Sequence, residues 1–320
     1  MAAAFCALTG GAANARGEAG LAPPTRVGQY RSVLQTCRRP GRADGQADRF
    51  AIRAMAVEGR ATLLTVDPAT LATALENAAD WACADAGEDA LRDTRFGRAL
   101  RADPPGEAKA SRVLRNEGLT HGAGQDGAGG GSFVTGDLCP SLRPLDRGFF
   151  ERFEAAAGPR APIALAVSGL WLLRHAADLE WLRGRERSGA LAITWVNHSF
   201  HHPFDPRRPL SQDFLLRPGL DVAAEVLDTE RLLIAQGIAP SVFFRFPGLV
   251  ANEDLLQKVR TLHLVTLGAD AWLALSQPPR PGAVVLIHPN GNEPLGLSIF
   301  GRELAAGRPP RPFRPLIEAP

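Results

Sequence analysis

Short apolar runs alternate with amphipathic segments in the second half of the chain, from about residue 132 to residue 290. Six of these runs have the length and bounding residues of buried strands, and they lie at 132–138, 161–169, 189–199, 240–248, 263–270 and 282–291. Between the first five runs, apolar residues recur at helical spacing at 145–157, 171–185, 221–237 and 252–262. This alternation predicts parallel strands joined by helical crossovers, and therefore an α/β fold that is either a barrel or a doubly wound sheet.

The first 130 residues follow a less regular pattern. Residues 1–28 are rich in alanine and glycine, which is typical of a leader or a disordered segment. In the next part, a strand is predicted at 61–66 and a helix is predicted to begin at Pro68, with Asp67 as its N-cap. We interpret residues 29–130 as an N-terminal extension or a small α/β subdomain that ends in a glycine-rich stretch. The barrel domain is predicted at 131–310, with 311–320 as a tail.

Composition and charge exclude several classes of function. The chain has 320 residues and a formal net charge of +2, which gives no reason to expect a nucleic-acid or acidic-membrane partner. No stretch reaches the roughly 18 to 20 consecutive apolar residues that a transmembrane helix needs. No Walker-type loop is present, so the sequence gives no sign of a P-loop nucleotide site. The sequence predicts no particular oligomeric state.

The N-terminus and the cysteines bear on localisation. A short apolar run is followed by Ala-Asn-Ala at 13–15, which is similar to a signal-peptide cleavage site, but a basic segment before the run is missing. We expect a periplasmic or secreted protein, with a cytoplasmic location as the alternative. If the protein is exported, Cys37 and Cys83 can form a disulfide; otherwise the cysteines, including Cys6 and Cys139, are ordinary buried thiols. No CxxC pair is present, which argues against a structural zinc knuckle.

Polar residues with catalytic chemistry follow nearly every predicted strand. These residues are Asp137, His198 with His202, Arg245, Asp270 and His288. In a parallel α/β barrel, the carboxyl ends of the strands converge on one mouth. We therefore expect these side chains to face one another across that mouth.

The histidines of the sequence NHSFHHP, at 197–203, predict a metal site. His198 and His202 are four residues apart, so one helical turn or a tight loop can aim both imidazoles at the same point. With the carboxylate of Asp137, they form a two-histidine, one-carboxylate set that leaves positions open for water and substrate. We predict a divalent metal, zinc, on these three residues, with a solvated histidine-rich loop as the alternative. His201 is expected to point away from the pair.

Three residues are predicted to support the chemistry. His288 follows four apolar strand residues and is predicted to be a general acid, or alternatively a capped histidine at a strand end. Arg245 is expected to orient a carboxylate at the mouth. Asp270 is expected to hold His288 or Arg245, or to cap a helix instead. We interpret His175 and His263 as structural.

In their order and spacing, these motifs resemble those of the NodB-homology polysaccharide deacetylases, carbohydrate esterase family four, over roughly residues 130–300. The sequence TGDLCP at 135–140 stands where the family has T-F-D-D-G-P, and HSFHHP at 198–203 matches H-[ST]-x-x-H-P fully. RFPGL from Arg245, ADAW at 269–272 and LIH ending at His288 correspond to the third, fourth and fifth motifs. The resemblance implies a distorted (β/α) barrel of the NodB-homology type.

The resemblance also implies a hydrolase that acts on carbon–nitrogen bonds other than peptide bonds. It implies the metal-dependent removal of an N-acetyl or O-acetyl group from a carbohydrate, with an acetylated glycan as the substrate partner. Asp137 would take the proton of the attacking water and Arg245 would orient Asp137. His288 would protonate the departing amine, and Asp270 would tune His288.

The sequence departs from the family at Leu138, which stands where the family has a metal-binding aspartate. If Asp137 binds the metal instead, Asp270 or Glu293 must act as the base. Otherwise the two histidines hold the metal with more water, or activity is lost. The alternatives to a deacetylase are therefore a catalytically impaired glycan-binding protein on the same barrel, or a metal-dependent hydrolase of another C–N amide bond.

Overall fold

The computed structural model describes residues 25–41, 48–101, 112–122 and 130–320. Most of the predicted leader, residues 1–24, lies outside these ranges. The strands are β1 (Val27–Arg38), β2 (Arg49–Val57), β3 (Arg60–Val66), β4 (Thr73–Asn77), β5 (Ala82–Asp85), β6 (Leu114–Arg115), β7 (Phe133–Leu138), β8 (Ala161–Val167), β9 (Leu191–Asn197), β10 (Phe243–Phe244), β11 (Val250–Ala251), β12 (Val265–Thr266), β13 (Ala271–Trp272) and β14 (Val284–Ile287).

The helices of the described ranges are mostly short. The α-helices are α1 (Arg95–Arg101), α2 (Arg147–Ala157), α3 (Gly169–Arg174), α4 (Ala176–Arg187), α5 (Val222–Ala235), α6 (Glu253–Thr261) and α7 (Pro294–Ala305). Single 3₁₀ turns lie at η1 (Ala78–Asp80), η2 (Glu88–Leu91), η3 (Leu210–Gln212), η4 (Phe214–Leu216), η5 (Pro247–Leu249), η6 (Leu273–Leu275) and η7 (Leu316–Glu318). None of the helices in the described ranges combines the length and apolar character that crossing a bilayer requires.

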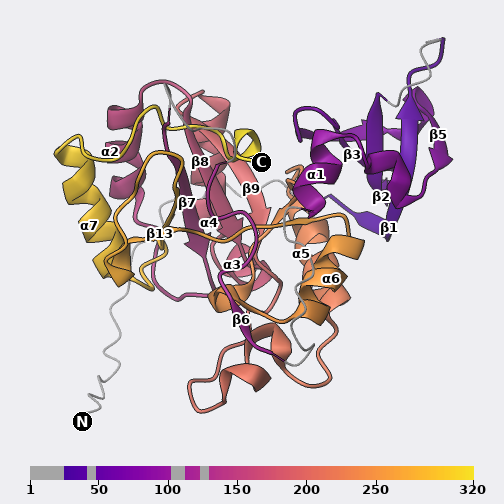
Figure 1. Cartoon of the computed structure of the whole chain (residues 1–320). Helices are drawn as coiled ribbons and strands as arrows, with labels where there is room; N and C mark the ends of the chain where they lie inside the picture. The colour runs from indigo at the N-terminus through magenta and orange to yellow at the C-terminus, as the bar shows by residue number, and fades with distance from the viewer. Residues whose placement is uncertain (1–24, 42–47, 102–111, 123–129) are drawn as a thin grey trace, which may run out of the picture.

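The second half of the chain is built on a seven-stranded sheet whose strand order is β12-β10-β9-β8-β7-β14-β13. Every pairing in this sheet is parallel. Helices α2 and α7 cover one side of it, and α5 and α6 lie at the other end (Figure 1). The predicted α/β barrel architecture is therefore confirmed, and six of its seven strands coincide with the six apolar runs.

Side chains along the parallel strands alternate between two apolar cores. In β7, Val134 and Leu138 pack with the aromatic residues of α2, whereas Phe133 belongs to the core inside the barrel. Because successive residues of a strand point to opposite faces, Asp137 shares the inner face with Phe133. The same alternation continues one residue past β7, so the side chain of Cys139 lies on the inner face with that of Asp137.

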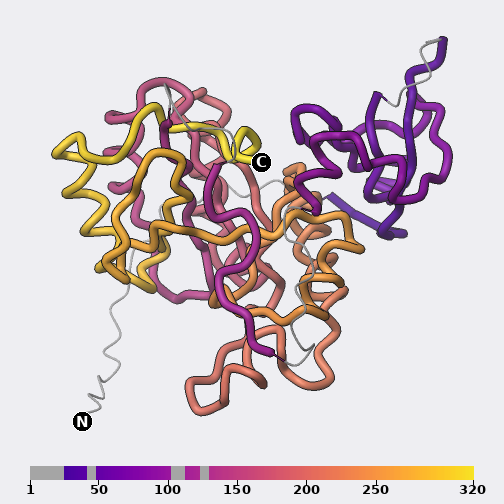
Figure 2. Tube along the Cα trace, viewed as in Figure 1, coloured from indigo at the N-terminus to yellow at the C-terminus, as the bar shows by residue number. Residues whose placement is uncertain are grey.

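Residues 119–122, which we call the closing segment, bridge the curved sheet from the side of β12 to the side of β14. Leu119 pairs with Leu267 just after β12, and His121 pairs with Ala283 just before β14. This stretch of chain continues from β6 and crosses the face of the barrel (Figure 2). The closing segment thus completes a distorted barrel that seven strands leave open.

The N-terminal part forms a five-stranded antiparallel sheet in the order β4-β3-β2-β1-β5. It lies beside the barrel, next to α5 and α6 (Figure 1). The buried Arg53 of β2 binds Glu230 of α5 through two contacts of 2.6 and 3.0 Å. Within the sheet, Cys37 of β1 lies directly opposite Cys83 of β5, and the two form a disulfide.

Two local predictions were wrong. The strand predicted at 61–66 is β3, but no helix follows Asp67. Its carboxylate accepts the N–H groups of Ala69 and Thr70 in a tight turn, and the chain then returns as β4 along β3. Asp favours such turns because its short side chain competes with the helical backbone.

The helix predicted at 171–185 is divided into α3 and α4. The break is at His175, which has non-helical φ and ψ angles of −118° and 43°. Its ring contacts the Ser141 carbonyl oxygen at 2.9 Å and the Asp178 carboxylate at 3.3 Å. These contacts hold the residue outside the helical conformation and give His175 a structural role.

The predicted tail packs onto the molecule. Arg95, at the start of α1, donates to the carbonyl oxygens of Ile317 at 2.7 Å and Pro320 at 3.0 Å. Leu316 is 2% exposed and belongs to the core that the N-terminal sheet shares with the barrel. The C-terminus is therefore held between the two sheets (Figure 2).

Candidate active site

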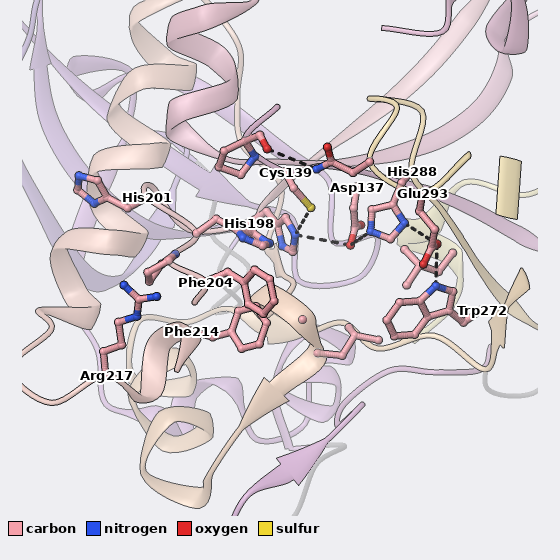
Figure 3. Close-up of a pocket in the computed structure, with 17 residues that line it drawn as sticks. Asp137, Cys139, His198, His201, Phe204, Phe214, Arg217, Trp272, His288 and Glu293 are labelled. Carbon is pink, nitrogen blue, oxygen red and sulfur yellow. Dashed lines mark hydrogen bonds and ion pairs between the residues drawn. The ribbon is translucent and has the colours of Figure 1, made fainter. Parts of the chain in front are cut away.

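The carboxyl ends of β7, β9 and β14 surround a cleft of about 710 Å³. Asp137, His198, His202 and His288 line it together (Figure 3). Arg245, which follows β10, is fully buried beneath it. The structure therefore brings five of the predicted site residues together.

His198 and His202 form a close pair, with ring centroids 4.7 Å apart. The Nδ1 atom of His198 lies 2.8 Å from the carbonyl oxygen of Arg245, so it carries the proton and leaves the Nε2 lone pair facing the cleft. His202 adopts a left-handed conformation with a φ of 47°, and its N–H donates to Ser199 Oγ at 3.2 Å. Among the described residues, its buried Nε2 atom has no hydrogen-bond partner. A tight loop, rather than a helical turn, aims the two rings at one point.

The third member of this cluster is Cys139, which the sequence analysis did not single out. Ligand atoms of Cys139, His198 and His202 all lie within 4.8 Å of one another. The Cys139 Sγ atom is 3.6 Å from His198 Nε2 and points toward it (Figure 3). Beside the predicted set of the two histidines with Asp137, the described residues thus offer a Cys-His-His group that can hold a metal ion. Strand alternation gave a signal for it, because Cys139 is two residues after Asp137.

Asp137 is instead held by Arg245. The guanidinium Nη1 donates to Asp137 Oδ1 at 2.7 Å and to Thr135 Oγ1 at 2.8 Å. The second carboxylate oxygen lies 3.6 Å from His198 Nε2 and 3.9 Å from His288 Nε2. The expected contact between Arg245 and Asp137 is thus present, and it leaves Oδ2 facing the two imidazoles.

His288 is oriented by Glu293. Its Nδ1 atom is 3.0 Å from Glu293 Oε2, which also accepts the indole N–H of Trp272 at 2.9 Å. A carboxylate on Nδ1 directs the other ring nitrogen, Nε2, toward Asp137 (Figure 3). Glu293 follows His288 by five residues and was considered in the sequence only as a substitute base.

Asp270 does not take the role predicted for it. Its Oδ1 atom accepts the backbone N–H of Val284 at 2.9 Å, and its Oδ2 atom contacts His121 Nδ1 at 2.7 Å. Arg280 approaches the same oxygen at 3.3 Å. Asp270 therefore ties the closing segment to β14, and the place beside His288 belongs to Glu293.

His201 points away from the metal-type cluster, as expected. Its Nδ1 atom is 2.6 Å from the Glu225 carboxylate, and its side chain is 62% exposed. Glu225 also accepts the backbone N–H groups of Phe200 and His201, both at 2.9 Å. Glu225 thus fixes the loop that carries His198 and His202.

The charges of the cleft favour a protonated His288 beside an ionised Asp137 and an ionised Cys139. Burial raises the pKa of Asp137, but the positive charge of Arg245, together with the nearby rings of His198 and His288, outweighs burial and lowers it. Burial likewise raises the pKa of the Cys139 thiol, yet the imidazoles of His202 and His198 hold it well below its ordinary value. Burial lowers the pKa of His288, but its interactions with Cys139 and Glu293 outweigh burial and raise it to about 10.

One wall of the cleft is aromatic and comes from the long connection between β9 and α5. Phe204 is 59% exposed and stacks on Phe214 with ring centroids 5.2 Å apart. Phe214 in turn meets His202 edge-on. Arg217 also lines this side and is held by Asp213, which is 1% exposed. Trp272 lines the cleft as well, beside His288 (Figure 3).

No protein-family model matches the chain. Its structure is similar to a family 4 carbohydrate esterase from Bacillus anthracis, with 14% sequence identity and a TM-score of 0.48, over 66% of this chain and 98% of that one. It is similar to Bacillus subtilis PdaA, a family 4 carbohydrate esterase, with 16% identity and a TM-score of 0.44, over 64% and 85% of the two chains. A family 4 pseudoenzyme from Bacillus anthracis is also similar, with 15% identity and a TM-score of 0.36, over 56% and 62%.

These structures belong to the family that the sequence motifs resemble. They include a carbohydrate esterase and a pseudoenzyme from the same organism. With every TM-score below 0.5, the chemistry of the site rests on the residues of this chain.

Proposed function

We propose that the protein is a metal-dependent hydrolase that removes N-acetyl or O-acetyl groups from a carbohydrate. One observation carries this proposal. A cluster of metal-type donors shares one cleft with a carboxylate held for proton acceptance and a histidine held for proton donation. Metal-assisted hydrolysis of an acyl group needs these three functions within reach of one reacting carbon.

The residues present fit a divalent metal ion, which we propose to be zinc. Cys139, His198 and His202 would hold it, because their donor atoms converge and the buried Nε2 of His202 has no other partner among the described residues. Three protein ligands leave a coordination position open, as in catalytic zinc sites. When bound, such an ion polarises the acyl carbonyl and lowers the pKa of water to about 7.

Asp137 and His288 supply the proton transfers. The carboxylate of Asp137, kept ionised by Arg245, accepts a proton from the attacking water at Oδ2, which faces the cleft. After the water oxygen has bonded to the acyl carbon, the bond from that carbon to the leaving atom breaks. The leaving nitrogen or oxygen takes the Nε2 proton of His288, whose Nδ1 is occupied by Glu293. Acetate and the free amine or hydroxyl are released, and the proton on Asp137 can return to His288 across 3.9 Å.

The aromatic wall supports a carbohydrate substrate. An exposed phenyl ring at the edge of a polar cleft offers a flat apolar face of the kind that recognises the apolar side of a ring-shaped polar ligand. Phe204 is held in such a position by its stacking on Phe214. We expect Phe204→Ala to raise KM for a glycan by roughly fivefold, which corresponds to about 1 kcal/mol of lost contact, with little change in kcat.

The test measures bound metal and acetate release from acetylated glycans for the unmodified protein and for three variants. His198→Ala is expected to lose both metal and activity, because it removes a donor of the cluster. Asp137→Asn is expected to keep the metal and lose acetate release by a factor of 10² to 10⁴, the usual contribution of general acid–base catalysis. His201→Ala is the matched control, since this histidine of the same loop binds Glu225 and should leave both quantities unchanged.

Two outcomes would overturn the proposal in different ways. Unmodified protein that binds metal and glycan but releases no acetate would be a glycan-binding protein on this barrel. Acetate release that survives His198→Ala would mean that the cluster is not part of the catalytic site.

We also propose that the protein works outside the reducing cytoplasm. The Cys37–Cys83 disulfide supports this, because such bonds persist in secreted and periplasmic proteins and are rare in the cytosol. Thiol labelling of the protein taken directly from its cells is expected to leave both cysteines unmodified until a reductant is added. Labelling of both without reductant would count against export.

A further inference from the structure

We propose that Cys139 binds the metal as a thiolate, so that the site takes Zn²⁺, Co²⁺ or Cd²⁺ in preference to Mg²⁺, Ca²⁺ or Mn²⁺. This proposal deepens the proposed function. The ligands are inferred from the geometry of the site, and only the use of the metal in hydrolysis rests on the proposed function. The resemblance of the sequence implies an aspartate as the third ligand, and this chain has Leu138 in that position. A cysteine in its place changes the chemical class of the site.

The direction of the side chains in β7 explains why the ligand moves by one residue. Leu138 is completely buried in the core beneath the outer helices and packs with Phe149 and Phe150 of α2. Asp137 and Cys139, on either side of it, both line the cleft. Because consecutive side chains alternate, the residue that joins Asp137 on the inner face is Cys139.

The backbone around Cys139 holds the sulfur in place. Its carbonyl oxygen accepts the side-chain amide of Asn290 at 2.8 Å, and Asn290 is completely buried. The carbonyl of the preceding Leu138 accepts both the N–H and the hydroxyl of Ser168, at 3.2 and 3.1 Å. A ligand fixed in this way loses little conformational freedom when a metal binds.

The two histidines present matching donors. Hydrogen bonding of His198 Nδ1 to the Arg245 carbonyl fixes the tautomer with a free Nε2, which is the atom that faces Cys139. The Nε2 atom of His202 is buried and has no partner in the described part of the chain. An uncompensated buried nitrogen costs stability, which a bound cation would recover.

Asp137 is less suited to be the third ligand. Its Oδ1 is taken by Arg245 at 2.7 Å, and a carboxylate in such a pair is already charge-compensated. The Cys139 sulfur instead lies 3.6 Å from Nε2 of His198, an imidazole that can be a second ligand to the same ion. A sulfur and two imidazole nitrogens are ligands for zinc, cobalt and cadmium, whereas magnesium, calcium and manganese prefer oxygen.

The test uses the full chain with Cys6→Ser, so that Cys139 is the one thiol outside the disulfide. Metal-free protein is titrated with Co²⁺, and the near-ultraviolet spectrum is recorded for the charge-transfer band of a cobalt–thiolate bond. Cys139→Ser and Cys139→Asp are added to the same background. Separately, the rate of Cys139 alkylation is measured with saturating Zn²⁺ or Mg²⁺.

The charge-transfer band is expected with Cys139 present and is expected to disappear in both substitutions. Zinc affinity should fall in Cys139→Asp by more than the roughly 10- to 100-fold that loss of an outer hydrogen-bond partner costs. Zn²⁺, but not Mg²⁺, should protect Cys139 from alkylation, and this measurement needs no variant of Cys139 to fold.

Cobalt binding without the band, or alkylation that saturating Zn²⁺ does not slow, would overturn the thiolate ligand. Acetate release under those conditions would leave the proposed function standing with a different ligand set. Conversely, a clear cobalt–thiolate band in a protein that releases no acetate would establish the site and refute the proposed function.

Discussion

The ion pair between Arg53 and Glu230 permits a prediction whose size follows from the structure. Both side chains are completely buried, and the guanidinium contacts both carboxylate oxygens, at 2.6 and 3.0 Å. The hydroxyl of Tyr30 donates to the same carboxylate at 2.7 Å. In Arg53→Met, the bond from Tyr30 is the one hydrogen bond that the Glu230 carboxylate keeps among the described residues. Leaving a buried charge without its partner costs about 3 to 5 kcal/mol, so the free energy of unfolding should fall by that amount.

The assay is urea unfolding followed by far-ultraviolet circular dichroism, for Arg53→Met, Glu230→Met and the double variant. Replacing both partners with apolar residues of similar size removes the unpaired charge, so the double variant should be more stable than either single one. The pair joins β2 to α5, so weakening it is also expected to separate the unfolding of the two parts. A loss below about 1 kcal/mol in Arg53→Met, or a double variant no better than the single ones, would refute this account.

Three further predictions concern His288, His263 and Asp270. Glu293→Gln removes an interaction that raises the pKa of His288, so the alkaline fall of kcat/KM should move to lower pH; an unmoved limb would exclude this histidine as the acid. Burial and the charge of Arg53 lower the pKa of His263 from 6.5 to about 4, so the unfolded chain takes up the proton first as the pH falls. Stability should therefore decline between these two pH values by at most about 3 kcal/mol, and His263→Asn should flatten that decline in urea unfolding. Asp270→Ala should lower stability by about 1 to 3 kcal/mol and leave kcat/KM per folded molecule unchanged; a lost kcat with intact stability would restore its catalytic role.

Much of the barrel could be predicted because its strands are continuous apolar runs in fixed alternation with helices. The convergence of His198, His202 and His288 followed from the rule that parallel strands end at the same side. The same rule could not place Asp270, because that residue precedes β13 and binds the backbone of β14. Position along the chain was therefore sufficient to place a residue that follows a strand. It was insufficient for Asp270, which precedes one.

Cys139 and Glu293 show a different limit. Whether Cys139 reaches the cleft depends on which face of β7 its side chain occupies. In the sequence, that face is indicated by the apolar Leu138, which lies between the inward-facing Asp137 and Cys139. The partner of His288 depends on the path of the loop after β14, which no periodicity describes. In both cases the family motifs imply an aspartate, whereas in this chain Cys139 lies against His198 and Glu293 contacts His288.

The closing segment has a consequence for association between molecules. The backbone of Leu119 accepts from Gly268 at 3.0 Å and donates to Thr266 at 2.9 Å, and Gly122 donates to Gly282 at 2.8 Å. These bonds occupy positions at which another chain could add a strand to the sheet. A chain that began at residue 131, the predicted start of the barrel domain, would leave them open. Its exposed strand edge would then favour edge-to-edge aggregation, although every residue lining the cleft would still be present.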